Sequence, residues 1–325
     1  MCFLKTRVAF KWANVYNENM ENYIVAVLGD CDLYVDEIAD NSIAVLDKKY
    51  LEGKVYRAVS CDNARYYHKF YEGLRNGKKY KFKSPTKIDY DEFFDALIMS
   101  GKENILYLAN STFFDDDYYL AKKASADSML KFPKSQILVL NSKGIGMQTG
   151  IWALKACENR FTLSCAEEYV RLKSEIENDC LFTIVYDCDE FAKNALLPSQ
   201  SIIGGSLVGV KPVITVDSEG KCALFRRCKS ERTAVTTILR YAKENGAYKN
   251  SFYVYSADSI RNELFAIAMI QDAFPGSRIR VGKAGQSAGA TFAPGALFIG
   301  FSAKRVQSKT KKKKGRVYND RISVE

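Results

Sequence analysis

The first half of the chain alternates short apolar runs with helical patterns. Four continuous apolar runs are typical of strands buried on both faces: Ile24–Leu28, Ile43–Leu46, Ile105–Leu108 and Ile137–Leu140. Helices are expected after Pro85 and over Tyr118–Leu130. Strands that alternate with helices in this way predict right-handed crossovers and a mostly parallel, Rossmann-like sheet.

The helix after Pro85 has a recognisable start and a single apolar face. Thr86 can cap its N-terminus, and Asp89 stands at the third helical position, where a carboxylate completes the cap. The apolar residues recur at helical spacing: Tyr90, Phe93, Phe94, Leu97 and Ile98. Gly101 should end this helix before the next strand.

The second half of the chain has a different order of elements. Its strand candidates are Phe182–Tyr186, Val213–Val216, Ala223–Arg226, Phe252–Tyr255, Ile279–Val281 and Leu297–Phe301. The segment Thr215–Gly220 has the turn residues of a hairpin, and helices are expected over Ser230–Glu244 and Ser259–Ala273. We therefore expect a C-terminal α+β domain with a mixed or antiparallel sheet.

The length of 325 residues suggests two domains. The expected organisation begins with an N-terminal extension (1–19) and an N-terminal α/β domain (20–170). A C-terminal α+β domain (171–303) and a basic, disordered tail (304–325) complete it. No apolar run approaches the roughly 18 residues of a membrane helix. Lys5, Arg7 and Lys11 interrupt the N-terminus, so we expect no signal peptide and a cytoplasmic protein.

The cysteines and the histidine exclude several kinds of site. Nine cysteines without a CxxC pair argue against a disulfide framework and against a zinc site. His68 is the single histidine of the chain, which excludes a His-based triad or a His-rich metal site.

The positive charge is concentrated at the C-terminus. The net charge is +10, and residues 303–325 have nine Lys or Arg against two Asp or Glu. The body therefore has little excess charge, and we do not expect it to bind nucleic acid. The run Lys311–Lys314 could hold RNA, membrane phosphate or an acidic partner, and it could equally be a solvated tail.

Polar residues follow two of the predicted parallel strands. One strand runs into Asn110–Asp117 and another into Asn141–Gly146, while the loop Lys81–Thr86 precedes the first helix. Ligands of open parallel sheets bind beyond such carboxyl ends. The acidic run Asp115–Asp117 is compatible with a hard metal ion, and also with the positive end of a helix dipole. The pairs Gly144/Gly146 and Gly204/Gly205 complete no phosphate-binding motif.

Six segments, in order, resemble the motifs of one family. They are Asp30–Leu33 ("DS(T)ADL"), Phe82–Thr86 ("TSQPS"), Ser111–Tyr118 ("SSxLSGTY"), Asn141–Gly150 ("DS/DT…GxG"), Phe191–Pro212 ("LxxGGRIS…GxLLxIKP") and Thr291–Ala296 ("HxGPGxxG"). From about Met20 to Lys304 the chain thus resembles the DegV family. The resemblance implies a two-domain α/β lipid binder that holds a fatty acyl chain in a buried tunnel, with its head group near the domain junction. Some members present the carboxylate to a fatty-acid kinase, which makes such a kinase a candidate partner.

The chain departs from the family where those proteins touch the ligand head group. Phe82, Asp115, Leu196 and Thr291 stand where the resemblance implies Thr, Ser, Arg and His. The implied polar mouth of the tunnel consists of Ser84, Thr86, Ser111, Thr112, Asp115 and Thr291. Because Asp115 would repel a fatty-acid anion, such a ligand would need Asp115 protonated, or Lys83 or Lys211 nearby.

The main hypothesis is therefore a DegV-like lipid-binding protein with an altered head-group site. It would bind a neutral, cationic or differently placed lipid and would need no cofactor, metal ion or catalytic residue. One alternative is a degenerate member that acts through protein–protein contacts. Another is a metal-dependent α/β enzyme that uses Asp115–Asp117, although no base–nucleophile arrangement accompanies these residues.

Overall fold

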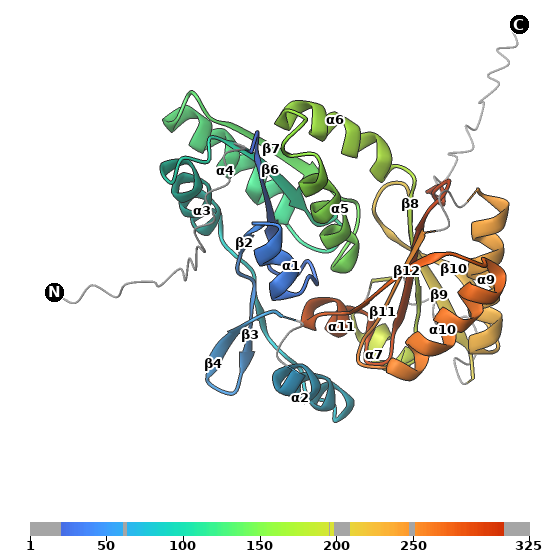
Figure 1. The fold of residues 1–325 in the computed structure, drawn as a ribbon. Helices are drawn as coiled ribbons and strands as arrows, with labels where there is room; N and C mark the ends of the chain where they lie inside the picture. The colour runs from blue at the N-terminus through green and yellow to red at the C-terminus, as the bar shows by residue number, and fades with distance from the viewer. Residues whose placement is uncertain (1–20, 61–63, 195, 198–208, 247–250, 309–325) are drawn as a thin grey trace, which may run out of the picture.

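The computed structural model describes residues 21–60, 64–194, 196–197, 209–246 and 251–308 (Figure 1). Within these ranges the chain forms a four-stranded, a six-stranded and a small three-stranded sheet. The predicted extension at 1–19, the pair Gly204/Gly205 and most of the expected basic tail lie outside the described residues.

The four-stranded sheet is entirely parallel, with the order β2-β1-β6-β7. Its strands are β1 (Ile24–Leu28), β2 (Ala44–Leu46), β6 (Asn104–Ala109) and β7 (Gln136–Asn141). Every residue of β1 is buried, because helices cover both faces of the sheet. The predicted parallel sheet is confirmed.

Two pairs of helices enclose this sheet (Figure 1). One face is covered by α3 (Lys87–Met99) and α4 (Asp117–Lys131), and the other by α5 (Met147–Glu158) and α6 (Cys165–Ile176). A short helix, α1 (Val35–Asp40), follows β1. The predicted cap of α3 is confirmed. The Thr86 hydroxyl accepts a hydrogen bond from the backbone N–H of Asp89, and the Asp89 carboxylate accepts one from the backbone N–H of Thr86.

The six-stranded sheet has the order β10-β9-β8-β13-β11-β12. Its strands are β8 (Asp179–Ile184), β9 (Lys211–Val216), β10 (Cys222–Cys228), β11 (Ser251–Ser256), β12 (Arg278–Lys283) and β13 (Leu297–Ser302). Neighbouring strands are antiparallel except β11 and β12, which are parallel. The predicted mixed sheet and its hairpin between β9 and β10 are confirmed.

The helices of the second half lie on both faces of this sheet. Its far face is covered by α9 (Glu231–Glu244) and α10 (Ile260–Ala273). The shorter helices α7 (Cys188–Lys193) and α11 (Gln286–Phe292) lie on the side of the first sheet (Figure 1). One continuous apolar cluster joins the two halves, with Val27, Trp152, Leu181, Tyr255 and Phe298 among its members.

A small sheet and one helix stand apart from both large sheets (Figure 1). The sheet consists of β3 (Lys49–Glu52), β4 (Val55–Ala58) and β5 (Phe82–Lys83), and α2 (Ala64–Arg75) packs on it. The same helix reaches the second half: Tyr71 donates to the Ala284 carbonyl (2.6 Å), and Arg75 pairs with Asp258 (2.7 Å). The strand pattern of the sequence missed this sheet, because its strands are too short for a period of two to stand out.

Two expected boundaries need correction. The prediction that the chain beyond Lys304 lacks tertiary packing is wrong for residues 305–308. Arg305 is 2% exposed and donates to the carbonyls of Lys143, Ile176 and Val216. The expected boundary at 170/171 falls inside α6, which packs on the first sheet, so the position of a domain boundary in this region stays a prediction. None of the described helices is long and apolar enough to cross a membrane.

Candidate functional site

Four polar residues follow the ends of the four parallel strands. Asp30 comes after β1, Lys48 after β2, Asn110 after β6 and Ser142 after β7. All four are buried. Because the strands are parallel, their carboxyl ends meet at one edge of the sheet, where α/β proteins place their ligands.

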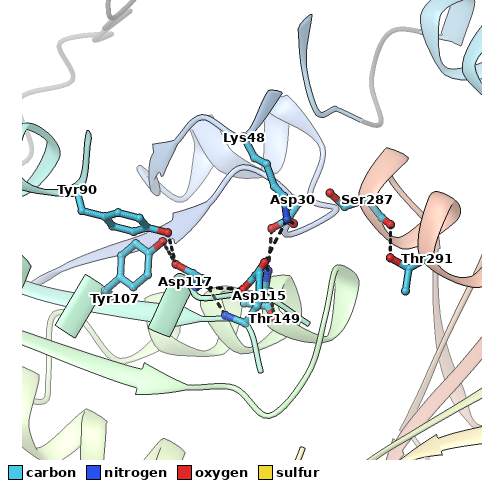
Figure 2. A network of polar contacts seen from close by, with 10 residues as sticks. Asp30, Lys48, Tyr90, Tyr107, Asp115, Asp117, Thr149, Ser287 and Thr291 are labelled. Carbon is cyan, nitrogen blue, oxygen red and sulfur yellow. Dashed lines mark hydrogen bonds and ion pairs between the residues drawn. The ribbon is translucent and has the colours of Figure 1, made fainter. Parts of the chain in front are cut away.

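Lys48 is the centre of this group and is bound by two aspartates. Its Nζ lies 2.6 Å from Asp30 Oδ2 and 3.1 Å from Asp115 Oδ2. The Lys48 and Asp30 side chains are 9% and 0% exposed, and that of Asp115 is 15% exposed. Figure 2 shows the ammonium pointing at both carboxylates. Two carboxylates therefore share a single ammonium.

A chain of hydrogen bonds fixes the other side of Asp30. Asn110 donates from Nδ2 to Asp30 Oδ1 (2.9 Å), and Thr149 on α5 donates to Asn110 Oδ1 (2.8 Å). The Ser142 hydroxyl lies 2.9 Å from that of Thr149. The Asn110 amide is thus oriented by Thr149, and its donor end faces the carboxylates.

Asp117 belongs to the neighbouring first turn of α4 and has its own partners. The hydroxyls of Tyr90 and Tyr107 both donate to Asp117 Oδ1 at 2.7 Å, and the backbone N–H of Asn110 donates to Oδ2 at 2.9 Å (Figure 2). The Asp117 amide in turn donates to Asp115 Oδ1 (3.2 Å). These bonds hold the loop between β6 and α4 in one conformation.

Burial and charge act in opposite directions on these groups. Burial raises the pKa of Asp115, although the charge of Lys48 opposes that effect. Burial, followed by the charge of Asp115, raises the pKa of Asp117 to about 7. Burial alone would lower the pKa of Lys48, but Asp30 and Asp115 hold it above its usual value. Lys48 is therefore a permanent cation at neutral pH.

The first two residues of the predicted mouth, Ser84 and Thr86, lie away from this network. Both are exposed, and the Thr86 hydroxyl donates to Asp89 (2.7 Å) in the cap of α3. Their role in a tunnel mouth stays a prediction.

The other four predicted residues lie closer to the junction of the two halves. The Ser111 hydroxyl is buried and donates to the Gly220 carbonyl (2.6 Å), which links the first sheet to the β9–β10 turn. Thr112 is half-buried beside it. Asp115 lies in the Lys48 network. Thr291 lies on α11, across from that network in Figure 2, and donates to the Ser287 carbonyl (2.7 Å).

Lys48 is the cation beside Asp115, and it was not predicted from the sequence. Lys83 or Lys211 was expected to offset the charge of Asp115. Lys83 is instead exposed next to the Tyr56 ring, and Lys211 donates to the Tyr186 carbonyl (3.5 Å). The sequence contained a signal for Lys48, since it is the second residue after a predicted parallel strand, where ligands of such sheets bind.

Three buried polar groups at the junction lack a hydrogen-bond partner among the described residues. They are both carboxylate oxygens of Asp32 and the hydroxyls of Tyr255 and Ser287. Asp32 faces the N-terminus of α5, where a Cβ on Gly146 would come within 2.3 Å of its Oδ2. Burial raises the pKa of Asp32 well above its usual value, although the nearby backbone amides of Gly285 and Met147 oppose that effect. Buried polar atoms without partners are costly, so they favour a bound group that would satisfy them.

Aromatic rings connect the Asp115 loop to the second sheet. The ring of Phe114 lies 6.2 Å from that of Phe292, which lies 5.9 Å from Phe191 and 5.3 Å from Phe298. Two pockets of the described chain lie elsewhere, one of about 360 Å³ between β10 and α9 and one of about 240 Å³ beside β4. Neither is lined by a residue of the predicted mouth.

The described residues contain no group of three or more His, Cys, Asp or Glu that could hold a metal ion. Asp115 is bound by Lys48, and Asp117 by two tyrosines. The metal-dependent alternative thus has no ligand cluster in the part of the chain described.

Known proteins share this architecture. A model of the DegV family, described as "Uncharacterised protein, DegV family", matches residues 27–304. A DegV domain-containing protein of Streptococcus pyogenes is 23% identical over 225 residues, which cover 67% of this chain and 74% of that protein. One of Clostridium perfringens is 20% identical over 235 residues, 71% of this chain and 80% of that protein.

Solved structures agree with this chain in fold. DegV of Bacillus subtilis, described as a fatty acid binding protein, superposes with a TM-score of 0.74 at 18% identity, over 88% of this chain and 100% of that one. A stearic-acid-binding protein of Eubacterium ventriosum gives 0.75 at 16% identity, over 87% and 98% of the two chains. At this identity the agreement shows the fold alone.

Proposed function

We propose that this chain, which belongs to the DegV family, binds a long-chain lipid whose head group has no free carboxylate. The observation that supports this most is the state of Lys48, whose ammonium is already bound by Asp30 and Asp115. The place expected for the ligand head group is therefore acidic.

The acyl part of the ligand would lie at the junction of the two halves. Relatives of the same fold are described as binding fatty acids, and some of those structures hold heptadecanoic or vaccenic acid. The corresponding region here is apolar, with Phe114, Phe191 and Phe292 packed from three different segments. Burial of an acyl chain gains about 0.8 kcal/mol for each methylene group.

The charge of the site sets the preference for the head group. Two carboxylates against one ammonium leave one excess negative charge, provided that Asp115 is ionised. A fatty-acid anion about 4 Å from that charge would be repelled by about 4 kcal/mol at an effective dielectric constant of 20. A hydroxyl or amine would meet no such repulsion.

The hydrogen-bonding atoms of the site point to the same class of ligand. The two oxygens of Asp32 and the hydroxyl of Ser287 form no hydrogen bond of good geometry with the described residues, and the backbone amides of Gly285 and Met147 lie near the Asp32 carboxylate. Because burial raises the pKa of Asp32, its protonated form is favoured, and a carboxyl group in that form both donates and accepts hydrogen bonds. The hydroxyls of fatty alcohols and monoacylglycerols likewise donate and accept, whereas a fatty-acid anion only accepts.

The proposal is tested with ligands that share one chain and differ in head group. The protein is purified gently, its organic extract is analysed by mass spectrometry, and the delipidated protein is titrated with oleate, oleyl alcohol, monoolein and oleylamine. We expect the neutral or cationic ligands to bind more tightly than oleate at pH 7.5. Tighter binding of oleate would contradict the head-group assignment, and no binding of any ligand would favour the alternative of protein–protein contacts.

A fatty-acid kinase as partner, which the family resemblance implies, rests on a ligand with a carboxylate. A ligand of the class proposed here has no free carboxylate for such a kinase to phosphorylate. We therefore expect no phosphorylated ligand when the loaded protein is incubated with ATP and such a kinase. Phosphate transfer to a bound acid would contradict the proposal.

A further inference from the structure

The small sheet and its surroundings contain a concentration of positive charge that the net charge of the body conceals. Residues 49–83 contain ten Lys or Arg against three Asp or Glu. This segment forms the three strands β4-β3-β5, here called the ribbon, together with α2. The ribbon projects from the body, away from both large sheets (Figure 1).

The two faces of the ribbon differ. Tyr50, Arg57 and Phe82 are paired across the strands and share the inner face. Aromatic packing covers that face, since the ring of Phe70 on α2 lies 5.3 Å from that of Tyr50 and 6.3 Å from that of Phe82. The inner face is thus part of the core.

The outer face is basic and lies open to solvent. Lys49 pairs with Lys83, and Leu51 pairs with Tyr56, so these four side chains share the outer face. Lys81 immediately precedes β5 and lies on the same side as Lys83, because strand residues two apart share a face. The Lys49 side chain is 45% exposed, and Lys81 and Lys83 are exposed. Two carboxylates lie beside this face: Asp47, 4.0 Å from Lys49, and Asp89, which is held in the cap of α3.

Apolar side chains accompany the lysines at the tip. Gly53, with a φ of 63°, and Lys54 form the turn between β3 and β4. Immediately after it, Tyr56 on the outer face is 44% exposed, and Val55, which pairs with Glu52 and points to the other face, is 55% exposed at the end of the strand. Neighbouring lysines and exposed apolar or aromatic tips are the combination that anchors proteins at the boundary between lipid head groups and acyl chains.

We propose that the outer face of the ribbon docks on an anionic lipid surface. Three observations favour this occupant over others. The charged residues of the face are lysines, whose compact ammonium groups on flexible stems suit a diffuse array of phosphates. The charge of the face is not complemented by either terminal segment, because residues 1–19 and 304–325 are themselves basic. The exposed Tyr56 ring gives the outer face an aromatic element that can insert, and Val55 adds apolar surface at the end of the tip.

The position of the ribbon fits a route for lipid transfer. Lys48, in the head-group network, is directly followed by Lys49, the first residue of β3 on the outer face. The surface proposed to meet the membrane therefore begins one residue from the site proposed to hold the lipid. This link rests on the proposed function, whereas docking itself does not.

Vesicle binding tests the docking surface with the full chain. Co-sedimentation is measured with vesicles of phosphatidylcholine alone and with about one third phosphatidylglycerol, at about 0.1 M salt. The ribbon variant is K49Q/K81Q/K83Q, and the tip variant is V55S/Y56S. The matched control, K123Q/K134Q/K229Q, removes the same charge from exposed lysines elsewhere. A variant with Lys311–Lys314 changed to Gln measures the contribution of the basic run.

We expect anionic vesicles to bind the protein, and the ribbon variant to bind at least about tenfold more weakly. The control should lose less than about threefold, and the tip variant should be weakened while its charge is unchanged. Equal losses from ribbon and control, no preference for anionic vesicles, or loss only from the Lys311–Lys314 variant would each overturn the proposal.

Two further measurements exclude other occupants. If the ribbon variant lost affinity for duplex DNA but kept that for vesicles, the face would be a nucleic-acid surface. If the variant changed the oligomeric state in gel filtration, the face would be an interface between copies. Either result would overturn membrane docking. Titration with monoolein, without vesicles, reports on the lipid site separately, so the two proposals can fail independently.

Discussion

Replacement of Lys48 by Met should destabilise the protein strongly at neutral pH. The variant keeps most of the side-chain volume but removes the ammonium that lies 2.6 Å from Asp30 and 3.1 Å from Asp115. Both carboxylates then stay in a buried site without a counter-charge. The bonds from Asn110 to Asp30 remain, but they cannot replace a charge.

The size of the effect follows from the burial of the three groups. Removal of one partner from a buried ion pair costs about 3–5 kcal/mol, because the remaining charge is left unpaired. Asp30 is fully buried, whereas the Asp115 side chain is 15% exposed and can recover some hydration. We therefore expect a loss near the lower end, about 3 kcal/mol in the free energy of unfolding.

The loss should depend on pH in a defined direction. Burial already raises the folded-state pKa of Asp115, and without the opposing charge of Lys48 it should rise further above its unfolded value. Raised carboxyl pKa values penalise the folded state at pH above them, and the penalty disappears as protonation neutralises the groups. The difference between variant and wild type should thus be largest at pH 7.5 and should shrink towards pH 5.

Urea denaturation followed by tryptophan fluorescence measures this effect, since Trp152 is 1% exposed and lies in the first half of the chain. The matched control is Lys87→Met, because Lys87 also pairs with two aspartates, Asp91 and Asp127, but is 36% exposed. Its loss should be a small fraction of that for Lys48. The triple variant K48M/D30N/D115N should recover at least half of the loss.

Two results would refute this reasoning. Equal losses for Lys48→Met and Lys87→Met would mean that the Lys48 pair is as hydrated as a surface pair. A loss for Lys48→Met that does not change between pH 7.5 and pH 5 would mean that the carboxylates are not its cause.

Three further predictions concern the site and the C-terminal segment. The double change D115S/T291H should tighten oleate binding by about 1–3 kcal/mol in calorimetry, because it removes one of the two carboxylates that share Lys48 and adds a donor. D116S is the control, and the absence of any gain would contradict the placement of Asp115 in the head-group site. Since burial raises the pKa of Asp117 to about 7, the folded state binds its proton more tightly, and this group should lower the free energy of unfolding as pH rises from 4 to 7. D117N should flatten that slope in urea titrations, and an unchanged slope would contradict the shift. A chain that ends at Ser308 should keep its melting temperature. The variant R305A should lose about 2–4 kcal/mol in the free energy of unfolding, because three carbonyls lose a buried donor. Equal stability of R305A and wild type would contradict this role.

The large elements could be predicted from the sequence because their signals are local. The run Ile24–Leu28 matches β1 in full, and the Thr86–Asp89 cap and the apolar face of α3 were identified residue by residue. These features depend on the period of apolar residues and on bonds between residues three apart. The family resemblance placed the two sheets in the right order, and the structure agrees.

The arrangement of the candidate site could be predicted only in part. The sequence analysis identified Asp115 as an uncompensated charge in the site of an anion. It could not identify Lys48 as the compensating cation, because the two residues are separated by 67 positions and meet only through the strand order β2-β1-β6. The adjacent order of these strands is a property of the assembled sheet.

By itself the sequence determined the strands, the helices and the concentration of charge in particular segments, since each follows from residues close together in the chain. Only the tertiary structure decided which charges oppose one another. It buried Arg305 from a segment that looks like a solvated tail, and it turned Lys49, Lys81 and Lys83 to the open face of a projecting ribbon. The physical reason is that burial and electrostatics depend on distance in space, and neither can be read from net charge or from composition.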